Sequence, residues 1–593
     1  MMITRKRLFT TVFVLLVVLG LAAAWGAWKS VGAKKHLDTA RGELATARQA
    51  LLDRDLPAAR TSIAAAGVET AAARDQVGGP LLAVLAHVPI LGRSFAVVRG
   101  VSLGADEIAH RVLPQALQVA EQLDPATLRR PGGAIDLAKL AAAAPELSST
   151  AGRMRAVDAR ATRLPDGLLP GAVLRARDSY VAQVRLLTTA VVDAADAVTS
   201  APTFLGADRP RRYFVMVQQT SESRGTGGLP GSYVVLEARA GKLAVTQSGS
   251  DADLVQGEVP ATGLPADFVE RYSPFGSLAD WRNVNLSPDL PVVADLVEKR
   301  WTAQGGQPLD GVIALDAVAL KDLLTGNGSI TVEGGRQIPP EQFESYLGVD
   351  QYAGYTDAEQ GVRKDQLVTA LRGVTDKLTG GAGDSTALLR GVVAALRSGH
   401  LHLTHDDPKV ASVLARHDLD GALPSGKAPL VYPVIFNATG GKLDYFLDRS
   451  LAWKANSCSG DYRRSDVTLT FVNRAPAVSA LPSYVTISQL GGPLVHSNVN
   501  QVGVQVYLTK GASVISATMN GKALQVGPGD GHASLQPGSE GGLPVYLTYA
   551  DLPPNVPAIL HLVVREPTAK GAPRVPEQPL ARPLATTVSV PTC

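Results

Sequence analysis

The chain has 593 residues, of which 45% are hydrophobic and 19% are charged, and its formal net charge is +3. This length is too great for one hydrophobic core, and the composition excludes an intrinsically disordered protein. The small net charge also argues against nucleic acid as a partner, because binding phosphates along a strand needs a concentrated basic face.

An uncharged run of 21 residues, Leu8 to Trp28, follows three basic residues near the N-terminus. About 20 apolar residues cross a bilayer as a helix. We therefore expect residues 8–28 to be a single transmembrane helix in the cell membrane, with residues 1–7 in the cytoplasm. The alternative is a cleaved signal peptide, because Ala22–Ala24 resembles a cleavage site. Under either interpretation, the rest of the chain is extracytoplasmic.

Residues 29–203 are expected to be helical. Leu37, Ala40, Leu44 and Ala47 recur at spacings of three and four residues, which places them on one face of a helix. Two interpretations stay open for this region. It is either a stalk that holds the next domain away from the membrane or a plain helical bundle.

Between residues 204 and 425, strand-like segments alternate with helical ones, which predicts an α/β domain. Residues 213–217 and 233–238 are two of the expected strands. The glycine-rich segment 218–232 lies between them and is expected to be a loop. Loops that a rigid scaffold holds in place are common positions for functional sites.

Residues 430–566 alternate between apolar and polar side chains with a period of two, which predicts an antiparallel β-sandwich. A proline-rich tail, residues 567–593, follows and ends in Cys593. The chain has two cysteines, Cys458 and Cys593. An exported protein can form disulfides, so we expect the two to be bonded; two free thiols are the alternative.

The glycine-rich segment is the leading candidate site. Its backbone N–H groups and Arg224 could hold a phosphate or a sugar. The alternative is a structural hairpin in which Glu222 and Arg224 pair with their neighbours. The candidate ligand-binding residues are Glu222, Arg224, Thr226, Gly227, Gly228, Arg282, Asn285 and Arg363.

Several motifs resemble the domain-of-unknown-function 4012 family, in the family's order and over nearly the whole chain. The family's name implies no activity. The motifs include Glu222-x-Arg224-x-Thr226-Gly227-Gly228, Arg282-x-x-Asn285-x-Ser287-Pro288-Asp289, Asp310-Gly311-Val312-Ile313-Ala314-Leu315-Asp316 and Gly440-Gly441-Lys442-Leu443-Asp444.

The α/β region also resembles the LytR-CpsA-Psr family, through residues 310–332, Arg363-Lys364-x-Gln366, and Asp251 with Asp253. This resemblance implies an anchored, extracytoplasmic phosphotransferase that takes glycans from polyprenyl-pyrophosphate carriers. It also implies Mg²⁺ bound by Asp251 or Asp253. Gly231-Ser232 stands where that family has Arg-Ser-Asp, and the arginine of its Pro-Arg-Asp motif is absent, so enzymatic activity stays open.

Together these inferences predict a membrane-anchored cell-envelope protein that binds a polyprenyl phosphate, a polyprenyl-linked precursor or another anionic cell-wall glycan. The alternative is a non-catalytic scaffold or adhesion protein that binds through its β-sandwich. Convergence of Arg224, Arg282 and Arg363 on one pocket would favour the first interpretation.

Overall fold

The computed structural model describes residues 29–50, 55–90, 92–332, 335–380, 383–456, 458, 460–488 and 493–593. The expected transmembrane helix, residues 8–28, lies outside this part of the chain. In the described part of the chain, every helix is either too short or too polar to span a membrane. The chain divides into two compact units. The first unit consists of the residues up to Leu128 together with Asp136–Pro202. The second unit consists of Arg129–Ile135 together with Thr203–Cys593.

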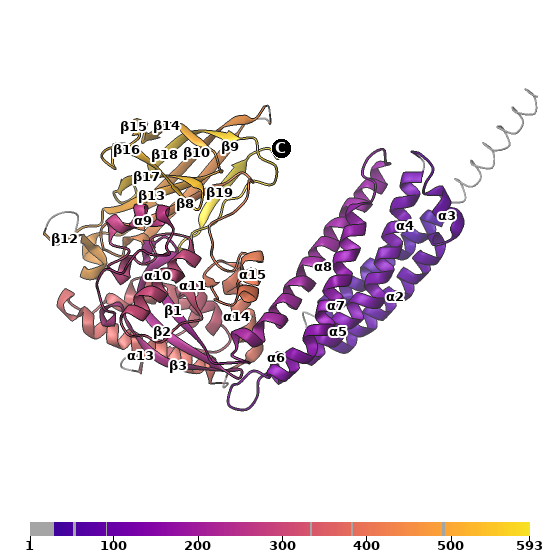
Figure 1. Ribbon diagram of the computed structural model, residues 1–593, viewed down its shortest axis with the longest axis horizontal. Helices are drawn as coiled ribbons and strands as arrows, with labels where there is room; N and C mark the ends of the chain where they lie inside the picture. The colour runs from indigo at the N-terminus through magenta and orange to yellow at the C-terminus, as the bar shows by residue number, and fades with distance from the viewer. Residues whose placement is uncertain are drawn as a thin grey trace, which may run out of the picture. The chain divides into compact units, whose positions relative to one another are not determined.

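The first unit is built of helices that pack side by side (Figure 1). Small residues form much of the contact surface, and Ala40 and Ala47 of the expected stripe are 2% and 3% exposed. The role of this unit as a stalk stays a prediction. Its helices are residues 29–50, α2 (Leu56–Val77), α3 (Pro80–Leu85), α4 (Gly92–Glu107), α5 (Leu113–Gln122), α6 (Pro125–Leu128), α7 (Leu137–Thr162) and α8 (Gly171–Phe204).

The α/β part of the second unit is built on a sheet that we call the α/β sheet. Within the described residues it has five strands in the order β3-β2-β1-β4-β7. β1 and β4 are parallel, from Tyr213↔Gly311 to Gln218↔Asp316, and the other neighbours are antiparallel. The strands are β1 (Arg211–Arg224), β2 (Gly227–Arg239), β3 (Lys242–Ser250), β4 (Gly311–Asp316) and β7 (Leu401–Leu403).

Helices cover both faces of the α/β sheet, as its alternating apolar residues require. Phe214 and Met216 face α10, whereas Tyr213 and Val215 face a layer of helices on the opposite side. The helices of this part are α9 (Ala266–Tyr272), α10 (Leu290–Ala303), α11 (Ala317–Leu324), α12 (Phe343–Gly348), α13 (Gln360–Thr379), α14 (Ser385–Arg397) and α15 (Pro408–Arg416); a small hairpin joins β5 (Ile330–Thr331) to β6 (Gln337–Ile338).

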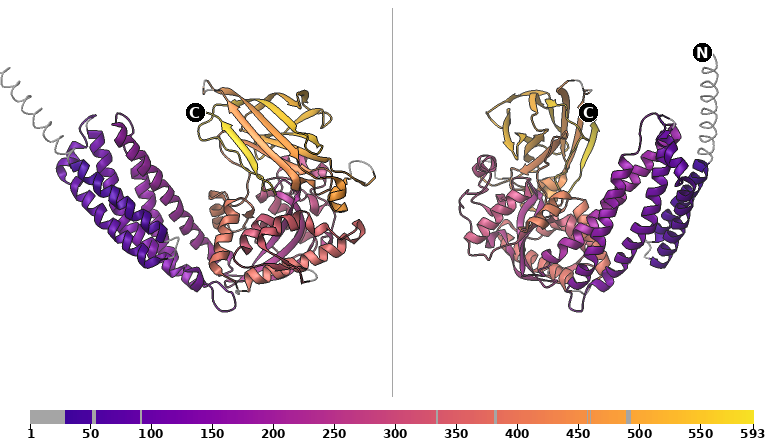
Figure 2. Two further views of the ribbon diagram at one scale, coloured as in Figure 1. Left: turned by 180° about the vertical axis from the view of Figure 1, so that it is seen from behind. Right: turned by 45° about the vertical axis from the view of Figure 1, so that its right-hand side comes forward.

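The C-terminal region is a single curled sheet rather than the two separate sheets of the expected sandwich. We call it the C-terminal sheet. Among the described residues its order is β19-β9-β10-β18-β14-β15-β16-β17-β13-β8. A short parallel pairing, from Gln525↔Ser534 to Val526↔Leu535, joins its two halves. The curl, visible in Figure 2, encloses one core that includes Trp453, Phe471 and Val504.

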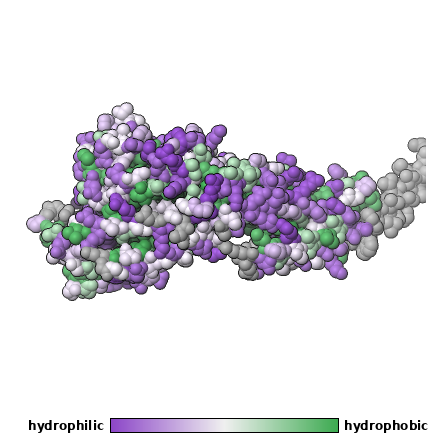
Figure 3. Space-filling view, turned by 90° about the horizontal axis from the view of Figure 1, so that it is seen from below, coloured by the Kyte–Doolittle hydropathy of each residue, from purple (hydrophilic) through white to green (hydrophobic). Residues whose placement is uncertain are grey.

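The strands of this region are β8 (Val431–Asn437), β9 (Leu447–Ala455), β10 (Tyr462–Asn473), β13 (Asn500–Leu508), β14 (Ser513–Met519), β15 (Lys522–Val526), β16 (Ser534–Glu540), β17 (Leu543–Leu552), β18 (Ala558–Pro567) and β19 (Leu584–Ser589), with the small pair β11 (Ile487–Ser488) and β12 (Val495–His496) beside them. Figure 3 shows the face of the molecule that is seen from below, where hydrophobic and hydrophilic residues are interspersed.

The predicted disulfide is confirmed. Cys458 and Cys593 are bonded, and their Cα atoms are 5.6 Å apart. The tail before Cys593 forms β19, which adds to β9 in parallel from Leu584↔Arg449 to Ser589↔Lys454. The disulfide and this pairing together fasten the C-terminal segment along one edge of the sheet.

Candidate functional site

The glycine-rich segment 218–232 is a strand hairpin, so the expectation of a loop was wrong. β1 and β2 stay paired as far as Arg224↔Gly227, and Gly225 and Thr226 alone form the turn. The two strands approach so closely here that only glycine, which has no side chain, fits between them. A Cβ atom on Gly228 would lie 2.2 Å from the carbonyl carbon of Gln219.

A bulge interrupts the hairpin. Between the pairs Gln219↔Leu229 and Ser223↔Gly228, three residues of β1 have no partner on β2. The last of these is Glu222. A bulge bends its strand and redirects side chains. Here the neighbouring Ser223 donates both its N–H and its hydroxyl to Asp444 of the C-terminal region, at 2.8 and 2.7 Å.

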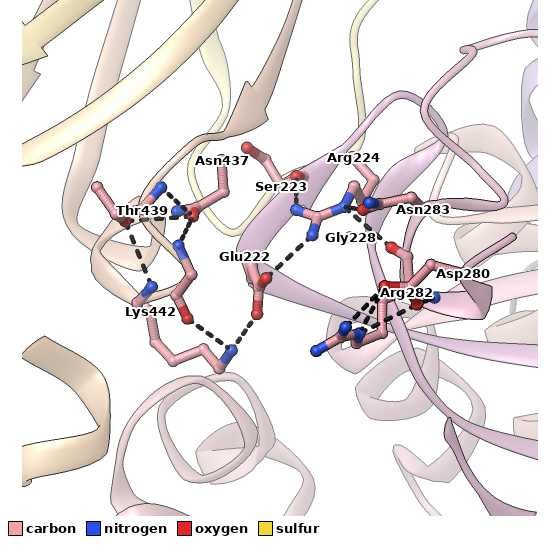
Figure 4. A network of polar contacts seen from close by, with 12 residues as sticks. Glu222, Ser223, Arg224, Gly228, Asp280, Arg282, Asn283, Asn437, Thr439 and Lys442 are labelled. Carbon is pink, nitrogen blue, oxygen red and sulfur yellow. Dashed lines mark hydrogen bonds and ion pairs between the residues drawn. The ribbon is translucent and has the colours of Figure 1, made fainter. Parts of the chain in front are cut away.

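Glu222 lies between two cations (Figure 4). The Nη2 atom of Arg224 lies 3.0 Å from Oε1 of Glu222, and the ammonium of Lys442 donates to Oε2. None of the three side chains is more than 8% exposed. Lys442 belongs to the C-terminal region, directly before η9 (Leu443–Phe446). This charged triad therefore joins the two sheets of the second unit.

The triad fixes the charges of its members. Burial by itself would raise the pKa of Glu222, but Lys442 and Arg224 outweigh burial and hold that pKa below its ordinary value. Burial likewise favours neutral Lys442, yet the Glu222 carboxylate raises the pKa of Lys442 well above its ordinary value. Both members of this buried pair are therefore ionised at neutral pH.

Arg224 faces away from solvent and is held on both sides. Besides its contact with Glu222, its Nε donates to the carbonyl of Arg282 at 3.0 Å and to Oδ1 of Asn283 at 3.2 Å. Asn285 donates to Oγ1 of Thr226 at 2.8 Å and so holds the hairpin turn. The sequence-predicted residues Arg224, Thr226, Gly227, Gly228 and Asn285 thus build the hairpin.

A cavity of about 170 Å³ lies beside the triad. Charged and apolar side chains both line it, a combination that suits an amphiphilic ligand. Its charged lining residues are Glu222, Asp251, Arg282, Arg363, Lys364 and Lys442. Its larger apolar and aromatic lining residues are Val217, Leu229, Leu347, Tyr352, Leu367, Leu371, Tyr484 and Ile487.

Arg363, in the first turn of α13, is a buried cation in this cavity and is 6% exposed. Its Nε donates to Gln360 at 2.6 Å and its Nη1 to Gln351 at 2.7 Å. Its guanidinium lies 4.5 Å from the ring centre of Tyr352 and 6.0 Å from that of Tyr484. Among the described residues, no carboxylate pairs with Arg363 and nothing accepts a hydrogen bond from its Nη2.

Arg282 also lines the cavity, but from the surface. Its side chain is 57% exposed and pairs with Asp280 at 2.7 Å. The three arginines that the sequence singled out therefore have different places. Arg282 and Arg363 line the cavity, whereas Arg224 supports Glu222 from behind and does not line it.

The two expected magnesium ligands have other partners. Asp251 lines the cavity and pairs with Lys364 at 2.6 Å, while Asp253 accepts the N–H and hydroxyl of Ser250 and closes a turn. In the described part of the chain, no cluster of three or more His, Cys, Asp or Glu residues could hold a metal ion. A Mg²⁺ ion can also be held by one or two carboxylates together with a substrate phosphate, so the Mg²⁺ site that the family resemblance implied stays a prediction.

Several cavity residues were not singled out from the sequence. Lys364 and Lys442 stood inside quoted motifs, so a weak signal existed for both. Gln351 and Tyr352 carried none, whereas Tyr484 stood in the family-like segment Leu481-Pro482-x-Tyr484-Val485. Their contact with Arg363 depends on the folding of α13 and the C-terminal region against the same hairpin.

The profile of a family described as a protein of unknown function (DUF4012) matches residues 208–352, from before β1 to beyond α12. The expected resemblance is thus confirmed for this part and not for nearly the whole chain. No curated protein matches. The X-ray structure of the Lin1025 protein from Listeria innocua is similar at 11% identity, over 39% of this chain and 86% of that chain, with a TM-score of 0.19. Neither description names the LytR-CpsA-Psr family.

Proposed function

We propose that this protein binds a polyprenyl phosphate, or a polyprenyl-linked or other anionic glycan precursor, in the cavity beside Arg363. The supporting observation is Arg363 itself. A buried guanidinium that no carboxylate neutralises costs free energy until an anion arrives. A phosphate oxygen could accept a charge-assisted hydrogen bond from its Nη2.

The charge around the cavity suits a phosphate. Among the described residues, the charged side chains of the lining and their direct partners leave an excess of two positive charges. A phosphate monoester carries about −1.5 to −2 at neutral pH. The cationic members of this set are Arg224, Arg282, Arg363, Lys364 and Lys442, and the anionic members are Glu222, Asp251 and Asp280.

The apolar lining suits the carbons next to the phosphate. Leu347, Leu367 and Leu371 come from α12 and α13 and line the same cavity as Arg363. The cavity is smaller than a typical ligand site of roughly 300–1,000 Å³. The proposal therefore concerns the phosphate and the first part of the hydrocarbon chain.

On this proposal the protein is anchored in the membrane by residues 8–28 and is extracytoplasmic, with an α/β part of LytR-CpsA-Psr type and a C-terminal part built on the curled sheet. The Cys458–Cys593 disulfide supports an oxidising compartment. Transfer of the glycan stays outside the proposal, because the family's arginine motifs are altered and Asp251 and Asp253 both have protein partners.

The test compares Arg363→Met with wild type in the full-length protein in detergent micelles. We expect farnesyl phosphate to bind wild type better than farnesol or inorganic phosphate. Charge-assisted hydrogen bonds contribute about 1.5–3 kcal/mol, so the variant should bind about ten- to a hundredfold more weakly. Its melting temperature should not fall, because the change removes an unpaired buried charge.

Arg372→Met is the matched control, since Arg372 is exposed on the same helix and contacts Ser248. It should bind farnesyl phosphate as wild type does. Equal affinity of wild type and Arg363→Met would contradict the proposal. Absence of any binding by wild type would favour the scaffold alternative, in which the C-terminal sheet makes the contacts.

A further inference from the structure

Gln578 lies in the segment between β18 and β19 and is completely buried, at 0% exposure. Its side-chain amide makes three hydrogen bonds with described residues. Nε2 donates to the carbonyls of Arg224 and Ile435, both at 2.7 Å, and Oε1 accepts from the N–H of Ile435 at 2.9 Å. Both N–H groups and the oxygen of the amide are therefore used.

These bonds close an edge of the C-terminal sheet. Ile435 belongs to β8, which is the last strand in the sheet order and pairs on its other side with β13. An edge strand leaves backbone groups unpaired. The Gln578 amide satisfies the N–H and the carbonyl of Ile435 much as a neighbouring strand would, and extends the contact to the hairpin of the α/β sheet.

The contact reaches the cavity through a short series of bonds. Gln578 holds the backbone of Arg224, the side chain of Arg224 holds Glu222, and Glu222 holds Lys442 at the cavity wall. Pro579, which follows Gln578 in the tail, packs on the turn of the hairpin. The carbonyl oxygen of Pro579 would lie 3.0 Å from a Cβ atom on Gly227.

The far end of the tail is also fastened. Beyond β19, Arg463 donates to the carbonyl of Pro591 at 2.8 Å, and Cys593 is bonded to Cys458. Gln578 is thus held between two anchored strands, β18 and β19, and its position depends on both.

We propose that Gln578 is a positioning residue for the charged triad and that the C-terminal tail, kept in place by its disulfide, supports from behind the hairpin that carries Glu222 to the wall of the cavity. The part of this proposal that concerns ligand affinity rests on the proposed function. The part that concerns the order of the hairpin does not.

The test measures hydrogen exchange in a peptide that covers residues 219–229, in full-length wild type and in Gln578→Leu. Leucine fills similar space but leaves the Arg224 and Ile435 backbone groups unpaired. The loss of a buried hydrogen bond costs about 1–3 kcal/mol, so protected amides of this peptide should exchange about five- to a hundredfold faster. Gln525→Leu, at an exposed position of β15, is the control and should match wild type.

A merely stabilising role would give a different result. The rate of hydrogen exchange would then increase in β13 and β17 by as much as in residues 219–229. The melting temperature would fall at the same time. Unchanged exchange in residues 219–229, or an even rise throughout the C-terminal sheet, would overturn the proposal.

The double variant Cys458→Ser/Cys593→Ser gives a second measurement that does not depend on how well Gln578→Leu folds. It should speed exchange in residues 219–229 more than in β13. Weaker farnesyl phosphate binding should accompany faster exchange in both variants. Faster exchange without any lipid phosphate binding by wild type would refute the proposed ligand and leave the positioning role standing.

Discussion

The two sides of the cavity hold buried positive charge in different ways. On the hairpin side, Arg224 and Lys442 share the carboxylate of Glu222. On the α13 side, Arg363 has only amide oxygens and aromatic faces among the described residues. A buried charge with its partner supports the fold, whereas one without a carboxylate gains from an incoming anion. On the proposed function, the first side of the cavity is therefore structural and the second side is the one that binds the anion.

The largest effect should follow from Glu222→Gln. This change leaves Arg224 and Lys442 buried without a countercharge, and breaking a buried pair in this way typically costs about 3–5 kcal/mol. Thermal unfolding of the full-length protein should show a clear fall in the melting temperature of the second unit. Asp448→Asn is the control, because Asp448 pairs at the surface with Arg474 and Arg582, and it should cost no more than about 1 kcal/mol. Equal effects of the two changes would remove the distinction between the two sides.

A smaller effect should appear with pH. The folded-state pKa of Glu222 lies below its ordinary value of 4.5, so its ionisation stabilises the fold fully above that value. This contribution is lost as the pH falls through the folded-state pKa. The difference in melting temperature between wild type and Glu222→Gln should therefore be constant at neutral pH and shrink below about pH 4.5. A difference that grows on acidification would contradict an ionised Glu222.

No such trend is expected for Arg363→Met. The hydrogen-bond partners of Arg363 are the neutral amides of Gln351 and Gln360, which do not titrate. The same series of melting curves, recorded for this variant, thus separates the two sides of the cavity.

The smallest effect should come from Asp280→Asn. Arg282 is more than half exposed, and its pair with Asp280 contributes about 0.2–1 kcal/mol at most. Asparagine keeps an oxygen for the N–H of Arg282 but frees the guanidinium to meet an anion in the cavity. We expect farnesyl phosphate affinity to rise by about 1.5- to fivefold with little change in stability. A loss of affinity would show that Arg282 needs Asp280 to hold it at the cavity.

Much of the architecture was accessible from the sequence because it depends on local patterns. Alternation with a period of two revealed the C-terminal strands, and two cysteines left one pairing. The hairpin stood only as the alternative because its glycines indicate a loop, whereas here they allow two strands to approach closely. The single curled sheet was missed because it depends on the short pairing of β15 with β16.

The cavity was only partly accessible for the same reason. Arg282 and Arg363 stood in recognisable motifs. The partner of Glu222, however, is Lys442, which lies 220 positions further along the chain. A contact between two residues so far apart in the sequence cannot be predicted from residue spacing or composition. The sequence could therefore supply candidate arginines but not tell which one is buried without a carboxylate.

The bulge in β1 has a consequence for how this sequence can change over evolution. Side chains of a strand alternate between its two faces, so a shift of one residue reverses them. Deleting either Thr220 or Ser221 would turn Glu222 away from Lys442, although neither residue belongs to the triad. Both side chains are buried, so substitutions of similar size should be tolerated at these two positions far better than insertions or deletions. The spacing of Glu222 from Gln219 and Ser223, as well as the presence of Glu222 itself, is what natural selection has to preserve.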